Sequence, residues 1–520
     1  MRNAVRNAGR VVVATGQAAP DPSWARFLYV YAVAPTPRSP RNEGAGRSGD
    51  PSRGSEQELD LSMIRVFSHY ISIRIVLLML IESIALLVAG FAGLALRFPT
   101  NPSFLTPEAF LFAFFMIFVM AALGLYQDEH PESFVSILNR TIIAFAAGSA
   151  LMSVVFYLLP DTYIGRGVFA YTAAFAFCAI LLVRTVFFQW SAFGILKKRV
   201  LILGAGEQAR AVLDLVSRNG HKQAIDVVGV HPLTTADVAV SAVNILPITM
   251  SVSEAVQQYS VHEIIIAMRE QRGGALPVSQ LLDCKLRGVQ ITDLQSFFER
   301  ELGQIRLDSL KASWLVFGEG CRQGLVRETV KRLFDVVASG ILVLFALPVM
   351  LVTALIIKTY DGGPIFYRQE RVGQGGRVFD ILKFRSMRSD AERDGKPKWA
   401  KSNDDRITPV GRFIRRTRID ELPQIINVLR GEMSFVGPRP ERPFFVRQLV
   451  QDIPFYAARH SVKPGITGWA QVRYPYGASL DDASKKLQYD LYYVKNHTLF
   501  LDLLILVETV EVVLWGKGAR

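Results

Sequence analysis

Cysteine is scarce in this chain of 520 residues, which contains only Cys178, Cys284 and Cys321. The three are widely spaced and form no Cys-x-x-Cys pair, so the sequence predicts neither a disulfide framework nor a thiolate metal site. No tyrosine is followed four positions later by lysine. That absence argues against the catalytic Tyr/Lys pair of a short-chain dehydrogenase or epimerase.

A periodic apolar pattern is missing from residues 1–62, where Gly, Ser, Pro and Arg dominate the second half. The short apolar patches in this stretch do not form the continuous hydrophobic region of a secretory signal. We therefore predict a disordered N-terminal extension. We also expect translation to begin at Met63 instead of Met1, because the organised pattern starts there.

Apolar residues make up half of the chain and gather first in four long runs. Each run approaches or exceeds the roughly 20 residues that a helix needs to cross about 30 Å of hydrocarbon. The segment 63–196 is thus predicted to be a bundle of four transmembrane helices, with both ends on the cytoplasmic side because basic residues follow the last run. The runs are Ile71–Leu96, Phe110–Leu125, Thr141–Leu159 and Val168–Trp190.

Residues 197–325 alternate short apolar strands with helical segments, which predicts a Rossmann-like α/β domain. The strand at 200–203 leads into Gly204 and Gly206, with Ala209 as the third small residue of a GxGxxA loop. No acidic residue follows the second strand to bind a ribose. Two interpretations stay open, a structural or regulatory loop and a site for NAD or another nucleotide.

A fifth apolar segment, Val336–Ile357, has no charged residue and contains Pro348. Proline inside a helix removes a backbone hydrogen bond and causes a kink. Both flanks are basic, with Lys331 and Arg332 as expected anchors at the membrane interface, whereas a spanning helix should be basic on one side. We therefore favour a re-entrant helix over an ordinary span.

The net charge of +13 suits nucleic acid, anionic lipid or phosphorylated substrates. Basic residues outnumber acidic ones between 364 and 447, but aromatic stacking platforms are not interleaved with them, which argues against nucleic acid. Lys383 and Arg385 share one side of an extended segment, and Arg439 lies in a rigid Gly-Pro-Arg-Pro turn. These three are candidate ligands for phosphate groups.

Asp420 and Glu421 form the centre of the stretch IDELPQIINVLRGEMSFVGPRPE. Pro423 and the apolar residues after it predict a short helix with the two carboxylates in its first turn. Backbone N–H groups at such a position favour the ionised form, so Asp420 is expected to be an anion. For an arbitrary pair, an ordinary helix cap is the simpler explanation.

In order along the chain, the Pro-broken helix, PIFYRQERVG, KFRSM, the Asp-Glu pair, SFVGPRPE and PGITGWAQV resemble the bacterial polyprenyl-phosphate sugar-1-phosphate transferases. The resemblance is dense over residues 326–520. The larger members of this family also carry four membrane helices and a Rossmann-like domain. The C-terminal sequence of this chain is similar to the exosortase-associated subgroup of exopolysaccharide systems. It implies a small, α-rich, monotopic α/β catalytic domain whose re-entrant helix covers residues 336–357.

The resemblance further implies that Asp420 attacks a UDP-sugar and expels UMP, and that a polyprenyl (undecaprenyl) phosphate then collects the sugar phosphate. Glu421 would help to hold Mg²⁺ or Mn²⁺ on the diphosphate. The protein would be in the bacterial inner membrane with a cytoplasmic catalytic domain. The larger family members suggest a homodimer, but the oligomeric state and the transferred sugar are undetermined. A membrane-anchored nucleotide-sugar dehydratase or epimerase and a non-enzymatic scaffold are the rival interpretations.

Overall fold

The computed structural model describes the chain from Met63 to Trp515 with gaps, and the predicted extension at 1–62 lies outside the described residues. The described ranges are 63–66, 69–98, 107–126, 134–162, 164–192, 197–217, 225–233, 245–268, 276–308, 310, 324–388, 406–475, 477 and 479–515.

Strands β1 (Met63–Val66) and β2 (His69–Ser72) pair antiparallel and lead directly into the first of four apolar helices. These helices are α1 (Ile73–Arg97), α2 (Pro107–Ala122), α3 (Phe134–Leu158) and α4 (Arg166–Ala192), with a 3-10 turn at Pro160–Thr162. They occupy the four predicted runs. Helices α1, α3 and α4 are long and apolar enough to cross a membrane, whereas the described part of α2 is shorter, at 16 residues.

Two charged residues inside the bundle bind each other. Arg184 on α4 lies 2.7 Å from Glu82 on α1, and both side chains are buried. A charge in hydrocarbon needs such a partner because its desolvation is costly. The pair therefore has a structural explanation within the bundle.

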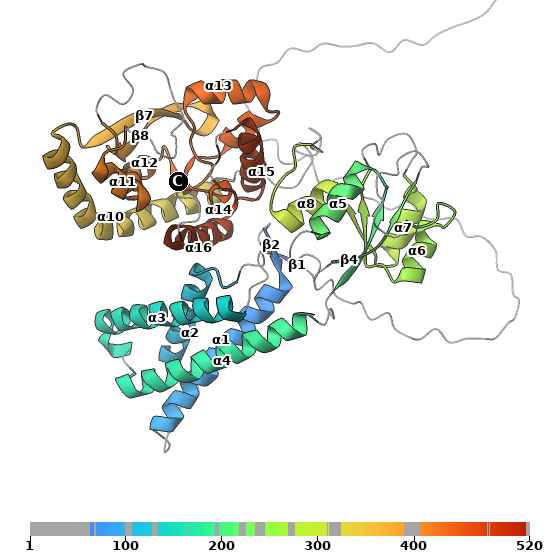
Figure 1. The fold of residues 1–520 in the computed structure, drawn as a ribbon, viewed down its shortest axis with the longest axis horizontal. Coiled ribbons are helices and arrows are strands. Elements are labelled where there is room, and N and C mark those ends of the chain that lie inside the picture. Colours follow the sequence, from blue (N-terminus) through green and yellow to red (C-terminus); the bar gives the residue numbers. More distant parts are fainter. Residues whose placement is uncertain are drawn as a thin grey trace, which may run out of the picture. The chain divides into compact units, whose positions relative to one another are not determined.

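The middle domain is a parallel sheet in the order β4-β3-β5-β6, flanked by helices as predicted. Strand β3 begins the domain, β4 joins it on one side and β5 on the other, so the direction of winding changes at β3. Figure 1 shows helices of this domain on both sides of the sheet. The bounds are β3 (Lys198–Leu203), α5 (Glu207–Ser217), β4 (Ile225–His231), α6 (Val252–Tyr259), β5 (Glu263–Ile266), α7 (Val278–Leu286), β6 (Gln290–Asp293) and α8 (Leu294–Leu302).

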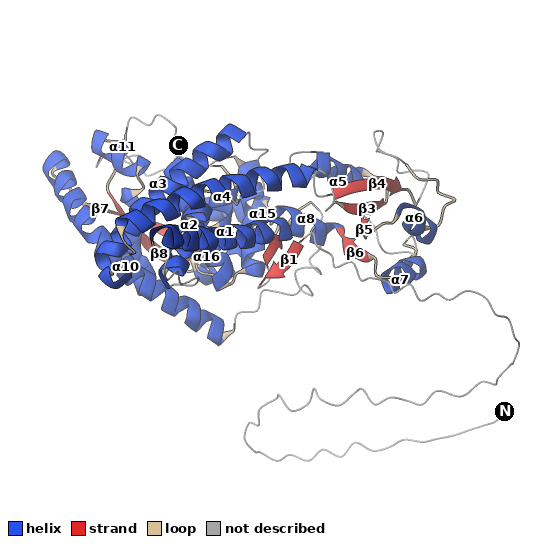
Figure 2. Cartoon of the chain, turned by 90° about the horizontal axis from the view of Figure 1, so that it is seen from below, coloured by secondary structure: helices blue, strands red, loops and turns tan. Residues whose placement is uncertain are grey.

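Helices dominate the C-terminal part of the chain, with the β7–β8 hairpin among them (Figure 2). Its core gathers side chains from strands and from several helices, including Val372, Val428, Trp469, Leu487 and Tyr492. The elements are α10 (Leu325–Asp361), β7 (Phe366–Val372), β8 (Val378–Phe384), α11 (Pro409–Arg416), η4 (Ile419–Gln424), α12 (Ile425–Arg430), β9 (Ser434–Val436), α13 (Pro443–Asp452), η5 (Tyr456–Ser461), β10 (Gly465–Thr467), α14 (Trp469–Arg473), α15 (Leu480–Asn496) and α16 (Leu499–Trp515), with a further 3-10 turn at Gln374–Gly376.

Helix α10 contains the fifth apolar segment and is a single element of 37 residues with Pro348 inside it. Figure 1 shows this helix bent partway along its length. Many of its large apolar side chains are exposed, among them Leu344, Phe345 and Leu355. An apolar surface of this kind marks a contact with lipid or with another protein.

The acidic residues of α16 point into the protein. Asp502 pairs with Lys331 and Glu508 pairs with Arg473, while Glu511 is buried next to Gly124. The structure shows that at least two of them are neutralised by cations of the same domain.

Candidate active site

The β7–β8 hairpin carries Lys383 to the Asp-Glu pair. The two strands pair antiparallel in an unbroken register that sets Lys383 opposite Tyr367. Phe384 fills the small core behind the hairpin, so the alternation of the strand turns Lys383 to the other face. Its Nζ lies 2.7 Å from Glu421 Oε1.

Asp420 and Glu421 lie in η4, a 3-10 turn that precedes the short helix α12. This corrects the prediction of an α-helical first turn. Arg418 adopts the left-handed conformation, with φ of 59°, so the chain turns sharply before the pair, and Pro423 falls inside η4. The tight turn leaves Asp420 only 7% exposed.

Asn427 lies on α12, six residues after Glu421, and bonds α12 to the edge of β8. Its Oδ1 accepts the backbone N–H of Leu382 at 3.0 Å, and its Nδ2 donates to the carbonyl oxygen of Asp380 at 2.7 Å. The same Nδ2 also donates to Glu432 at 2.7 Å. Because these bonds fix β8 just before Lys383, they help to hold it in register with Glu421.

Glu421 is the carboxylate that three cations share, and we call Lys383, Arg418 and Arg439 the cation cluster. Both Lys383 Nζ and Arg439 Nη2 donate to its Oε1, at 2.7 and 3.0 Å. Arg418 Nη1 lies 3.8 Å from its Oε2. Three separate segments of the chain thus converge on one carboxylate.

The pKa values of the two adjacent carboxyl groups are shifted in opposite directions. Burial raises the pKa of Asp420, and the neighbouring Glu421 charge raises it further, against Lys383, Arg415 and Arg418. Burial also opposes ionisation of Glu421, but Lys383, Arg439 and Arg418 outweigh it and hold the pKa of Glu421 well below its ordinary value. The backbone of the turn was expected to favour ionised Asp420, whereas burial and the charge of Glu421 act in the opposite direction on its pKa. That Asp420 is an anion stays a prediction.

The Gly-Pro-Arg-Pro turn presents Arg439 to Glu421. Gly437 donates its N–H to the carbonyl oxygen of Thr467 at 2.9 Å, next to the parallel β9–β10 pair. A side chain at Gly437 would collide with the backbone of Lys463, so only glycine fits. The two prolines on either side then restrict the backbone around Arg439.

Sequence reasoning left Arg415 and Arg418 out of the phosphate-binding set, although both act electrostatically on Asp420. Arg415 also donates to Ser386 at 3.0 Å. Their position in the sequence shortly before the Asp-Glu pair was the available signal. Arg385, which was predicted beside Lys383, is buried, and its guanidinium lies against Gly363 because β8 ends at Phe384. Its role as a phosphate ligand stays a prediction.

Lys331 and Arg332 attach α10 to the catalytic core. Lys331 Nζ binds Asp502 at 2.6 Å and the carbonyl oxygen of Val436 at 3.2 Å. Arg332 donates to the last carbonyl groups of α12, and Asp335 accepts from Ser434 and Phe435. The predicted membrane contact of the two cations stays a prediction. Their side chains are held by protein groups on the elements that carry the site.

The glycine loop of the middle domain follows β3 as predicted. Gly204 has φ of 106°, and a Cβ there would lie 2.6 Å from the carbonyl oxygen of Ala267 on the neighbouring strand. Ala209 is fully buried in the helix–sheet core. Close packing thus explains Gly204 and Ala209, a Cβ on Gly206 would meet open space, and nucleotide binding stays open.

The Asp-Glu pair matches the way in which proteins hold Mg²⁺. Across the described residues, no group of three or more His, Cys, Asp or Glu side chains could form a metal cage. Mg²⁺ or Mn²⁺ with substrate phosphates needs only one or two carboxylates. Glu421 Oε1 accepts from two cations, whereas Oε2 lies 3.8 Å from Arg418, so Oε2 is the oxygen that fits such a role.

Comparison with protein families gives two matches. The model of the bacterial sugar transferases matches residues 326–516, and a CoA-binding domain model matches residues 121–276. The first range contains every residue of the candidate site. The second covers part of the membrane bundle and most of the middle domain.

Curated relatives share the same region. The chain is 42% identical to a UDP-N-acetylgalactosamine-undecaprenyl-phosphate N-acetylgalactosaminephosphotransferase of Aeromonas hydrophila, over 46% of this chain and 56% of the relative. It is 37% identical to a UDP-glucose:undecaprenyl-phosphate glucose-1-phosphate transferase of Escherichia coli, over 48% and 54%. An undecaprenyl-phosphate galactose phosphotransferase of Salmonella typhimurium is 32% identical over 63% and 70%. The chain spans about half the length of the first two relatives.

Proposed function

The chain belongs to the bacterial sugar transferase family, and from this we propose that it transfers a sugar 1-phosphate from a UDP-sugar to a polyprenyl phosphate, such as undecaprenyl phosphate. One observation carries the proposal. A buried Asp420 and a largely buried Glu421 lie among several cations in the domain that begins with the apolar helix α10.

Asp420 is the proposed nucleophile. Its raised pKa makes its oxygens more basic than those of Glu421, whose Oε1 already accepts two cationic donors. An Oδ of Asp420 forms a bond to the sugar-proximal phosphorus, and the bond from that phosphorus to the bridging oxygen breaks. The bridging oxygen and its electron pair leave with UMP.

In the second step, an oxygen of the polyprenyl phosphate attacks the same phosphorus and the Asp420 carboxylate departs. Lys383, Arg439, Arg415 and Arg418 offset the charge of the phosphates in both steps. Glu421, with the substrate phosphates, would hold Mg²⁺, which when bound supplies charge neutralisation at the diphosphate. The products are UMP and a polyprenyl diphosphate sugar.

Helix α10 supports a reaction at the cytoplasmic membrane surface. Its apolar side chains are exposed, its ribbon is bent, and its first turns are fastened to the site by Lys331, Arg332 and Asp335 (Figure 1). A helix that enters and leaves on one side would hold the site at the depth of a lipid phosphate. Nucleotide sugars are made on that same side, so both substrates could meet there.

The test is to trap the intermediate. Purified protein is incubated with UDP-sugar carrying ³²P in the sugar-proximal phosphate, without lipid acceptor, and the protein is then separated and counted. We expect label on wild type, stoichiometric release of UMP, and neither with Asp420→Asn. Asp380→Asn, an exposed carboxylate on the neighbouring strand, is the matched control and should label normally.

The donor sugar is chosen from a panel, because the relatives are named for N-acetylgalactosamine, glucose and galactose. Undecaprenyl phosphate added afterwards should remove the label into the lipid phase. An unlabelled wild type with every sugar of the panel, or a labelled Asp420→Asn, would contradict the proposal. Conversion of the free nucleotide sugar without UMP release would favour a dehydratase or epimerase instead.

A further inference from the structure

Besides the N–H of Gly437, the carbonyl groups of three successive residues hold the turn that presents Arg439. Pro438 and Pro440 have no N–H to donate. The carbonyl oxygen of Pro438 accepts from Gly465 at 3.0 Å, and that of Pro440 accepts from Arg371 at 2.9 Å. The carbonyl oxygen between them, on Arg439 itself, accepts from Arg459 Nη2 at 2.9 Å.

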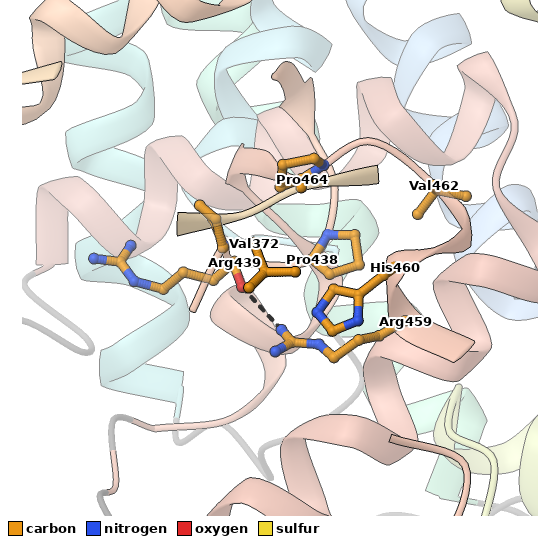
Figure 3. A pocket seen from close by; sticks show the side chains of 9 residues that line it. Val372, Pro438, Arg439, Arg459, His460, Val462 and Pro464 are labelled. Atoms are coloured by element: carbon orange, nitrogen blue, oxygen red, sulfur yellow. Dashed lines mark hydrogen bonds between the residues drawn. The ribbon is translucent and has the colours of Figure 1, made fainter. Parts of the chain in front are cut away.

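Arg459 approaches from the side of the turn opposite to the Arg439 side chain. Figure 3 shows the guanidinium of Arg459 bonded to the backbone of Arg439, while the Arg439 side chain extends away from His460 and Val462. A small pocket lies on this backbone side of the turn, between Val372 and the segment around Pro464. Arg459 therefore touches the scaffold of the site and not its cation cluster.

Asp490 on α15 fixes Arg459 in turn. Its Oδ2 lies 2.8 Å from Arg459 Nη2, and Tyr456 accepts from Nη1 at 2.7 Å. Arg459 is 5% exposed and Asp490 is 2% exposed. An ion pair this deep is costly to desolvate, and apolar replacements of similar volume are often neutral for stability. Stability alone does not explain why the core contains it.

We propose that Arg459, held by Asp490, is a positioning residue that sets Arg439 for the donor diphosphate. The path runs from Asp490 to Arg459, through the Arg439 backbone, and from the Arg439 side chain to Glu421 at 3.0 Å. Loss of the anchor lets the turn shift, so Arg439 no longer meets the phosphates in the reactive geometry. This inference rests on the proposed function and concerns its first step.

Arg459→Lys keeps the charge beside Asp490 but cannot supply the same set of planar donors. We expect about tenfold slower formation of the labelled adduct, or a tenfold higher KM for UDP-sugar, because one charged hydrogen bond to the turn is lost. The double variant R459M/D490L removes both charges and should fold while showing the same defect. Arg473→Lys, in the ion pair with Glu508, is the matched control and should leave the KM unchanged.

A double-mutant cycle separates positioning from a merely structural role. The Arg459→Lys substitution should slow adduct formation or raise the KM when Arg439 is present. It should have no such effect in the Arg439→Ala background, since Arg459 then has no side chain to position. An equal cost in both backgrounds would overturn the inference while leaving the proposed function intact. A wild type that forms no adduct with any UDP-sugar would overturn the proposed function, and the inference with it.

Discussion

Lys383 Nζ lies 2.7 Å from Glu421 Oε1, and this contact distinguishes two carboxyl groups that are neighbours in the chain. It binds a strand residue to the turn that carries Asp420. It also keeps Glu421 ionised, and the resulting charge helps to raise the pKa of Asp420. The predictions below follow from that arrangement and from the elements that maintain it.

Lys383→Met should slow adduct formation about 100-fold, since removal of one preorganised donor to developing charge typically costs 10²–10³ in rate. Lys383→Arg, which keeps the charge, should lose less. The rate of UMP release in a single turnover measures both. Lys495→Met removes a comparable ion pair with Glu299, away from the site, and should retain the wild-type rate. A wild-type rate in Lys383→Met would contradict the role of Lys383 in offsetting the charge of the phosphates.

Asp420→Asn should stabilise the protein at neutral pH by an amount on the order of 1 kcal/mol. The folded state raises the pKa of Asp420 above its unfolded value, so its contribution to stability is present at low pH and is lost as pH rises through the folded pKa. The amide removes this cost. Thermal unfolding in detergent at several pH values measures the difference, which should shrink toward pH 4.

Glu421→Gln should change the free energy of unfolding in the opposite direction and destabilise the protein. Since the folded state lowers the pKa of Glu421, its stabilisation is present above the unfolded pKa and is lost as pH falls through the lowered value. Removing the carboxylate leaves Lys383 and Arg439 without their shared partner and should cost about 3 kcal/mol at neutral pH. Equal shifts for the two variants would refute the opposing electrostatics.

Asn427→Ala should slow adduct formation about tenfold and lower the free energy of unfolding by about 2 kcal/mol. The change leaves the N–H of Leu382 and the carbonyl group of Asp380 without a partner and lets β8 shift against η4. Asn496→Ala, a buried asparagine that bonds to Glu299, provides the comparison. It should lose stability without the rate defect. The same rate loss in both would point to general destabilisation.

Both flanks of α10 should be accessible from the cytoplasmic face. Single cysteines in place of Val326 and Tyr360, which are exposed residues on either side of the apolar segment, are placed in a chain without its three native cysteines. An impermeant maleimide should label both in inverted vesicles and neither in intact cells or spheroplasts. Phe98→Cys, at the far end of α1, should label from the periplasmic face. Labelling of the two α10 positions from opposite faces would establish a span.

Local patterns predicted most elements well. The four apolar runs and the strand–glycine loop–helix unit are decided by residues close in sequence. Boundaries shifted where tertiary contacts intervene. The Asp-Glu pair was misplaced on an α-helix because the left-handed Arg418 and the bonds from Asn427 to β8 favour a 3-10 turn there.

The sequence by itself determined the membrane runs, the α/β repeat and the identity of the paired carboxylates, since these depend on composition, periodicity and short motifs. Only the tertiary structure decided which cations serve Glu421 and that Asp420 is harder to ionise than an ordinary aspartate. It also decided that Arg459 reaches the Arg439 backbone. Burial and contacts between residues 18 to 96 positions apart depend on how the elements pack, and no local pattern encodes that.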